Sequence, residues 1–101
     1  MGSSQQSGSL RIARFVAHHL EVPAQPPGGE AVPVSLVVGP GGPLPFAVRR
    51  LGARRWVLMV GGDTADDGTF RTYRSACAAA RAASRDLVAD LQSLAASGLV
   101  A

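Results

Sequence analysis

Arginine side chains are the residues with the clearest chemistry in this 101-residue sequence. All ten basic residues are Arg and none is Lys, against seven acidic residues, which gives a net charge of +3. Four arginines flank one short stretch, and a tryptophan follows them directly: Arg49, Arg50, Arg54, Arg55 and Trp56. Because a guanidinium binds phosphate and guanine through two parallel hydrogen bonds, this cluster predicts contact with nucleic acid.

A second set of arginines follows later in the chain. Arg74, Arg81 and Arg85 share one flank of an expected helix, in line with Arg71 just before it. They extend the predicted nucleic-acid contacts to Arg74 and Arg81. Both sets also have a structural interpretation: paired arginines keep a hairpin tip soluble and discourage edge pairing, and charges on a helix flank form a solvated face.

The remaining reactive residue types lack the spacing of a catalytic or metal site. His18 and His19 are adjacent and point apart on either a strand or a helix. The stretch 61–68, GGDTADDG, lacks both the calcium-loop ligand pattern and the Lys of a phosphate loop. We therefore expect no catalytic residue, metal, cofactor or small-molecule substrate, and no enzyme. The single Cys77 is expected to be a small buried apolar residue.

The elements that must position the arginines are short strands and one helix. Two stretches rich in Pro and Gly, 23–30 and 39–45, should continue neither a helix nor a central strand. The Val-rich run 31–38 between them predicts a strand. Runs 46–50 and 55–60 predict a hairpin around Leu51–Arg54. The acids of 63–67 predict a turn before the helix.

The first ordered segment is ambiguous. Leu10 to Val22 fits period two and also a capped helix, and its β-branched and aromatic residues favour a strand. From Thr72 to about Ser97 the pattern predicts one long helix, with Thr72 as N-cap and Gly98 as the stop. Its core stripe is expected to contain Tyr73, Cys77, Ala80, Leu87, Leu91 and Leu94.

One stretch resembles a known family. Val48 to Ala83 contains V-R-R, R-W-V, G-T-F-x-T and A-x-x-A-A-R, and is similar to DNA-binding domains of the AP2/integrase-arm type. It is also similar to a short bacterial β-plus-helix family of unknown function. The first resemblance implies a small antiparallel sheet packed on a helix, with DNA contacts from Arg49, Arg50, Arg55 and Trp56.

Together these patterns predict an α+β fold, with an antiparallel sheet of three or four strands packed against one long C-terminal helix. Residues 1–9 are expected to be a disordered leader or tag, and 10–101 a single domain. Apolar runs of about five residues are too short to span a membrane, and no secretory signal is visible, which favours the cytoplasm. The leading hypothesis is a small nucleic-acid-binding or accessory protein. The alternative is a non-enzymatic protein-interaction module, such as a homodimer.

Overall fold

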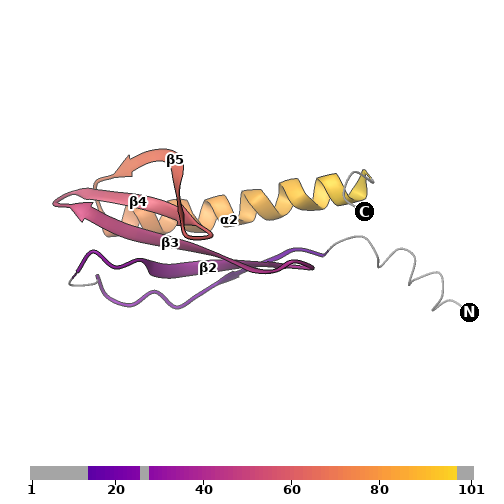
Figure 1. Cartoon of the computed structure of the whole chain (residues 1–101), viewed down its shortest axis with the longest axis horizontal. Helices are drawn as coiled ribbons and strands as arrows, with labels where there is room; N and C mark the ends of the chain where they lie inside the picture. The colour runs from indigo at the N-terminus through magenta and orange to yellow at the C-terminus, as the bar shows by residue number, and fades with distance from the viewer. Residues whose placement is uncertain (1–13, 26–27, 98–101) are drawn as a thin grey trace, which may run out of the picture.

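The computed structural model describes residues 14–25 and 28–97, which form one sheet and one helix (Figure 1). The expected leader, residues 1–9, lies outside the described residues. The described elements are β1 (Val16–His19), β2 (Val32–Gly39), β3 (Gly42–Gly52), β4 (Arg55–Val60), β5 (Asp63–Phe70) and α2 (Tyr73–Ala96). The α+β class with one long C-terminal helix is confirmed. The predicted strand count is wrong, because the sheet has five strands in the order β1-β2-β3-β4-β5.

The fifth strand lies where the sequence predicted an acidic turn. Val60 pairs with Asp63, so Gly61 and Gly62 alone connect β4 to β5. Both glycines have positive φ, 62° and 91°, which a two-residue turn of the type I′ class requires. The acidic residues after them therefore belong to a strand. Four residues between Thr64 and Thr69 fall outside regular pairing with β4, and this part of β5 arches away from its neighbour (Figure 1).

Strand β3 also begins earlier than expected, inside a stretch predicted to interrupt strands. Gly39 pairs with Gly42, and Pro43 and Pro45 pair with residues of β2. The carbonyl of Pro45 accepts a hydrogen bond from the N–H of Gly61, so the backbone nitrogen and carbonyl of Pro45 both face the end of β4. Pro43, two residues away, faces the same side. Since β4 has ended there, neither missing N–H breaks a ladder bond.

The ambiguous first segment contains a strand. Residues Val16–His19 pair antiparallel with β2, and the backbone N–H of Leu20 continues the pairing by donating to Val34. The strand interpretation is confirmed for this part, and Leu10 to Ala13 lie outside the described residues.

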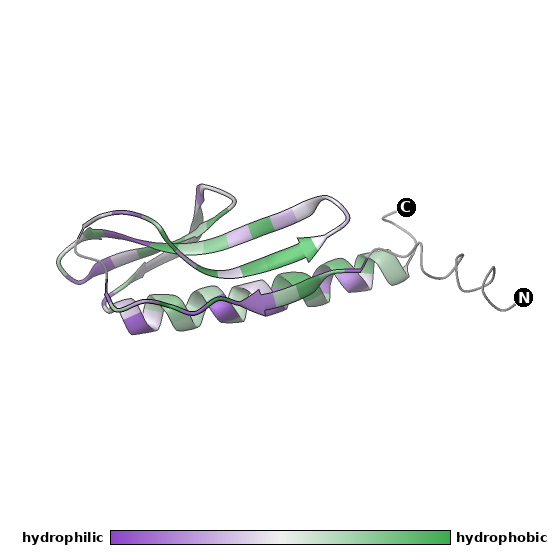
Figure 2. Cartoon of the chain, turned by 90° about the horizontal axis from the view of Figure 1, so that it is seen from below, coloured by the Kyte–Doolittle hydropathy of each residue, from purple (hydrophilic) through white to green (hydrophobic). Residues whose placement is uncertain are grey.

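Helix α2 packs along one face of the sheet (Figure 2). The side chain of Thr72 caps it as predicted, accepting from the N–H of Ser75 at 3.0 Å; Gly98 lies outside the described residues. Cys77 and Ala80 are buried as predicted, but Leu94 is 41% exposed and so does not belong to the core stripe. The core between sheet and helix includes Val34, Phe46, Val48, Trp56, Leu58, Ala76, Cys77 and Ala80. Among the described residues, no helix is long and apolar enough to cross a membrane.

Candidate nucleic-acid interface

The β3–β4 hairpin brings four of the predicted arginines together. Gly52 pairs with Arg55, and Arg50 pairs with Trp56 across the two strands. The turn between them consists of Ala53 and Arg54, and Arg54 has a φ of 58°, in the left-handed region. The side chains of Arg54 and Arg55 are exposed. The hairpin therefore brings the backbones of the four arginines to one end of the ribbon, with the side chains of Arg49 and Arg50 on opposite faces of the sheet.

Two of these arginines are anchored to the backbone. The Nε of Arg49 donates to the carbonyl of Gly29 at 3.0 Å, and the Nε of Arg50 donates to the carbonyl of Gly52 at 3.2 Å. Nε is the donor in each bond, so the two terminal nitrogens of each guanidinium take no part in these hydrogen bonds. Because the acceptors are neutral carbonyls, these bonds orient the side chains without cancelling their charge.

Trp56 differs from the arginines around it. Its side chain is only 2% exposed, and its ring lies 5.0 Å from the ring of Tyr73. Alternation along β4 places Trp56 on the face that packs against α2, together with Leu58. The prediction that Trp56 contacts nucleic acid is therefore wrong for this folded state, since the indole belongs to the hydrophobic core.

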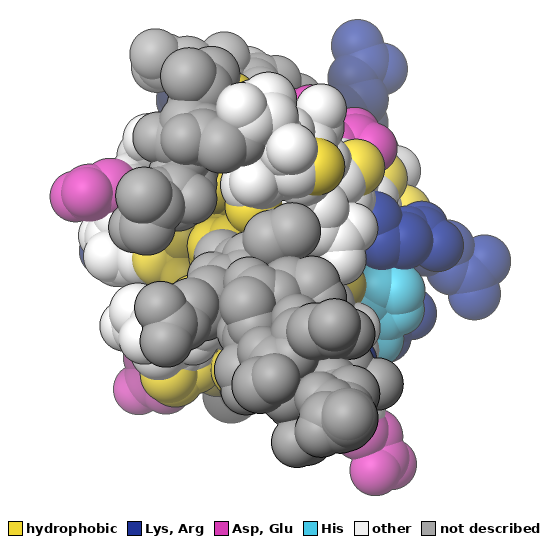
Figure 3. Space-filling model, turned by 90° about the vertical axis from the view of Figure 1, so that its right-hand side faces the viewer, with side chains coloured by type: hydrophobic (Ala, Val, Ile, Leu, Met, Phe, Trp, Pro, Cys, Tyr) yellow, Lys and Arg dark blue, Asp and Glu magenta, His cyan; other side chains and the backbone are white. Residues whose placement is uncertain are grey.

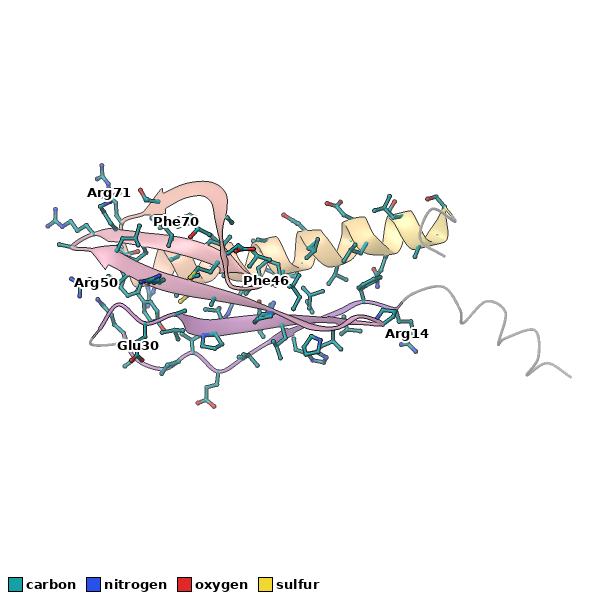
Figure 4. All side chains as sticks on the ribbon, in the orientation of Figure 1. Arg14, Glu30, Phe46, Arg50, Phe70 and Arg71 are labelled. Carbon is teal, nitrogen blue, oxygen red and sulfur yellow. The ribbon has the colours of Figure 1, made fainter. Side chains whose placement is uncertain are left out.

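The end of β5 and the start of α2 add two further arginines to the same end of the molecule. Phe70 pairs with Trp56, next to the pair Gly52–Arg55 that closes the turn, so Arg71 follows β5 near the tip of the arginine hairpin. Tyr73 packs on Trp56, and the exposed Arg74 follows it in the first helical turn. Figure 4 shows Arg50 and Arg71 at the same end of the ribbon. Sequence reasoning placed Arg71 near Arg74 but not in the site, because β5 was not expected.

Arg81 does not join this group. One of its terminal nitrogens donates to the backbone carbonyl of Leu20 at 3.4 Å, and its buried Nε has no hydrogen-bond partner among the described residues. At 1.5 Å per residue, Arg81 lies roughly 10 Å further along the helix axis than Arg74. Its observed contact ties the helix to the segment after β1. The guanidinium of Arg81 is therefore half-buried beside Leu20 rather than exposed together with that of Arg74.

The arginine end is the set Arg49, Arg50, Arg54, Arg55, Arg71 and Arg74. Its local charge is reinforced by the N-terminus of α2, where the helix dipole is positive and the first turn contains no acidic residue. Glu30 is the acidic side chain labelled at this end (Figure 4). Figure 3 views the molecule from the opposite end, with acidic side chains visible around the outline and His beside Arg on one side.

Other reactive groups stay apart from this end. Within residues 14–25 and 28–97 there is no cluster of three or more His, Cys, Asp or Glu side chains that could hold a metal ion, and no pocket. His18 and His19 are both exposed. Cys77 is buried as predicted, and burial raises the pKa of its thiol above the usual value. A thiol in that state is mostly protonated at neutral pH and therefore a weak nucleophile.

Comparisons of this chain with protein-family models, with curated proteins and with solved structures gave no match. The arginine end is therefore the feature of the molecule from which we infer a function.

Proposed function

We propose that this chain is a small DNA-binding protein that contacts duplex DNA with its arginine end. The observation that carries the proposal is the meeting of two separate chain segments. The hairpin supplies Arg54 and Arg55 at its tip, and the β5–α2 junction supplies Arg71 and Arg74, all with exposed side chains. Guanidinium groups in this arrangement favour a polyanion over a single small anion.

Phosphate contact supplies most of the binding free energy in this proposal. Each guanidinium that meets a phosphate releases condensed counterions, so affinity falls with salt. Four exposed arginines give an expected slope of log affinity against log salt of about −3.6, and all six of the arginine end give about −5.4. The affinity should therefore fall by roughly two to three orders of magnitude between about 50 and 200 mM salt.

Fluorescence anisotropy with a labelled duplex tests this proposal. The full chain should bind at about 50 mM salt, with the slope given above. Replacing Arg54, Arg55, Arg71 and Arg74 together by Ala should abolish most of the binding. The matched control is Arg85→Ala, which removes an exposed arginine on α2 outside the arginine end. Absence of binding by the unmodified chain, or equal losses in the control and the quadruple variant, would refute the proposal.

A second candidate function, self-association, is favoured by the sheet face that α2 leaves uncovered. Leu36, Val38, Ala47 and Met59 alternate with the core residues of β2, β3 and β4; they are half-buried and do not belong to the core cluster. Such a face can pair with a second copy of the chain. Sedimentation equilibrium should then show a dimer that Met59→Glu dissociates. A monomer at all concentrations would exclude this candidate.

A further inference from the structure

Aromatic side chains near the arginine end point into the core rather than outward. Trp56 is 2% exposed, and Phe70 and Tyr73 are partly buried against the core cluster. Proteins that bind unpaired bases usually stack them on exposed aromatic rings. The arginine end offers no fully exposed ring among its described residues, so it is better suited to a duplex than to a single strand.

Leu51 is the apolar side chain that this end does expose. It is 52% exposed, the highest value among the exposed large hydrophobic residues of the described chain. The register of the hairpin shifts between Arg50 and Gly52, so Leu51 has no partner across the ladder. A bulge of this kind re-aims a side chain and bends the strand. Leu51 is thus directed away from both the core and the ladder, at the tip of the hairpin.

Arginines lie on both sides of this leucine. Arg49 and Arg50 precede it on β3, and Arg54 and Arg55 follow it across the turn. The arrangement is an apolar side chain at the tip of a two-stranded ribbon, flanked by groups that bind phosphate. Proteins that bend DNA commonly insert one such side chain between base pairs from the minor groove, while cations hold the backbone on either side.

The major groove admits a two-stranded ribbon without distortion, whereas entry from the minor groove needs a wedge. Paired strands are about 4.8 Å apart before side chains are added, and the minor groove of regular duplex DNA is only about 6 Å wide. An arginine-bearing ribbon can therefore enter the minor groove only if the groove opens. Separating two stacked base pairs bends the duplex away from the protein and widens the groove.

We propose that Leu51 is a wedge that inserts between stacked base pairs and bends the bound duplex; this inference rests on the proposed DNA-binding function. The phosphate contacts of the neighbouring arginines offset the loss of stacking. Because the wedge needs no particular base, its preference is for flexible steps such as TA rather than for a fixed sequence. A deformable duplex is therefore the partner expected to bind best.

An end-labelled duplex of about 20 base pairs with a central TA step, carrying a FRET pair, tests the wedge. The full chain should shorten the end-to-end distance on binding at about 50 mM salt. Leu51→Ala should reduce affinity about tenfold and remove the distance change, because a leucine side chain loses its apolar burial. Its salt slope should stay unchanged, since the arginines remain. Leu94→Ala is the matched control, being 41% exposed at the far end of α2.

The outcomes separate the wedge from the DNA-binding proposal. Equal affinity and equal FRET change in Leu51→Ala and the unmodified chain would overturn the wedge alone. No duplex binding by the unmodified chain would overturn both. An exposed leucine among arginines could also insert into an anionic bilayer, so vesicles containing phosphatidylserine form a second arm. Vesicle binding that depends on Leu51, with no effect of Leu51 on DNA, would assign the leucine to a membrane instead.

Discussion

Replacement of Arg54 by glycine should stabilise the fold and weaken DNA binding at the same time. Arg54 is the only non-glycine residue with positive φ among the described residues, at 58°. Its Cβ is crowded in this conformation, whereas glycine adopts it freely. The exposed guanidinium, by contrast, makes no contribution to the core. The two roles of the residue can therefore be separated by one substitution.

The expected gain in stability follows from two opposing terms. A left-handed conformation costs a residue with a side chain about 1–2 kcal/mol. Glycine also lowers the free energy of unfolding by about 0.4–1 kcal/mol, because it increases the conformational entropy of the unfolded chain. The net increase in the free energy of unfolding for Arg54→Gly is therefore about 0.5–1 kcal/mol. For a domain of this size, that corresponds to a rise in Tm of roughly 2–8 °C.

The expected loss in binding follows from the removal of one phosphate contact. The slope of log affinity against log salt should become less negative by about 0.9. Arg54→Ala should lose the same binding contribution, but it retains a Cβ in the left-handed region and so should not gain stability. The alanine variant thus separates the effect of charge from the effect of the backbone.

Thermal unfolding followed by circular dichroism and duplex anisotropy at several salt concentrations measure the two effects. A lower Tm in Arg54→Gly than in the unmodified chain would refute the backbone argument. An unchanged salt slope in both Arg54→Gly and Arg54→Ala would refute the assignment of Arg54 to the DNA contact, whatever the stability result.

Three further predictions concern a turn, the core and a buried thiol. Gly62→Ala should lower the free energy of unfolding in urea by about 1–2 kcal/mol, because Gly62 has a φ of 91°. Gly41→Ala should cause no such loss, because Gly41 has no positive φ and a Cβ there would meet no neighbouring atom. Equal losses in the two variants would contradict this. Trp56→Phe should leave duplex affinity unchanged, since the ring packs on Tyr73; a lower affinity in a folded variant would restore Trp56 to the interface. The free energy of unfolding should fall as pH rises above about 9, because burial raises the pKa of Cys77 and of Tyr73 in the folded state, so the unfolded chain loses these protons first. Urea titrations at alkaline pH measure this change. A free energy of unfolding that does not change with pH would contradict the prediction.

Local patterns with a single strong interpretation could be predicted from the sequence. The start of α2 at Tyr73 agrees with the prediction of Thr72 as N-cap. The cap residue and the amphipathic, alanine-rich pattern after it both indicate the same helix. The β3–β4 hairpin was predicted for the same reason, since two β-prone runs flank a four-residue stretch containing Gly52. These are elements whose local preference and final packing coincide.

Strand β5 could not be predicted in the same way, because its composition argues against a strand. Three of its eight residues are Asp, a residue type that strands usually avoid. The signal for β5 is the pair Gly61-Gly62, which is typical of a two-residue hairpin turn. Without β5 the sequence could not place Arg71 at the arginine end, because Arg71 directly follows that strand.

Burial of Trp56 shows a second limit of sequence reasoning. Its position beside Arg54 and Arg55 suggested a surface cluster, but neighbouring residues on a strand face opposite sides of the sheet. The side that meets the helix is set by α2 and by the pairing of β4, which depend on distant parts of the chain. Spacing along the sequence thus identified the arginines but not which of their neighbours shared their surface.

Two arginines at the arginine end occupy positions where they reduce the stability of the fold. Arg54 has a backbone conformation that favours glycine, and Arg74 lies in the first turn of α2, near the positive end of the helix dipole. An acidic residue in that turn would stabilise the helix by about 0.3–1 kcal/mol. Folding alone would therefore favour glycine at 54 and Asp or Glu at 74. The occurrence of arginine at both, on segments that converge only in the folded chain, is expected where positive charge is retained for an anionic partner, and supports the DNA-binding proposal.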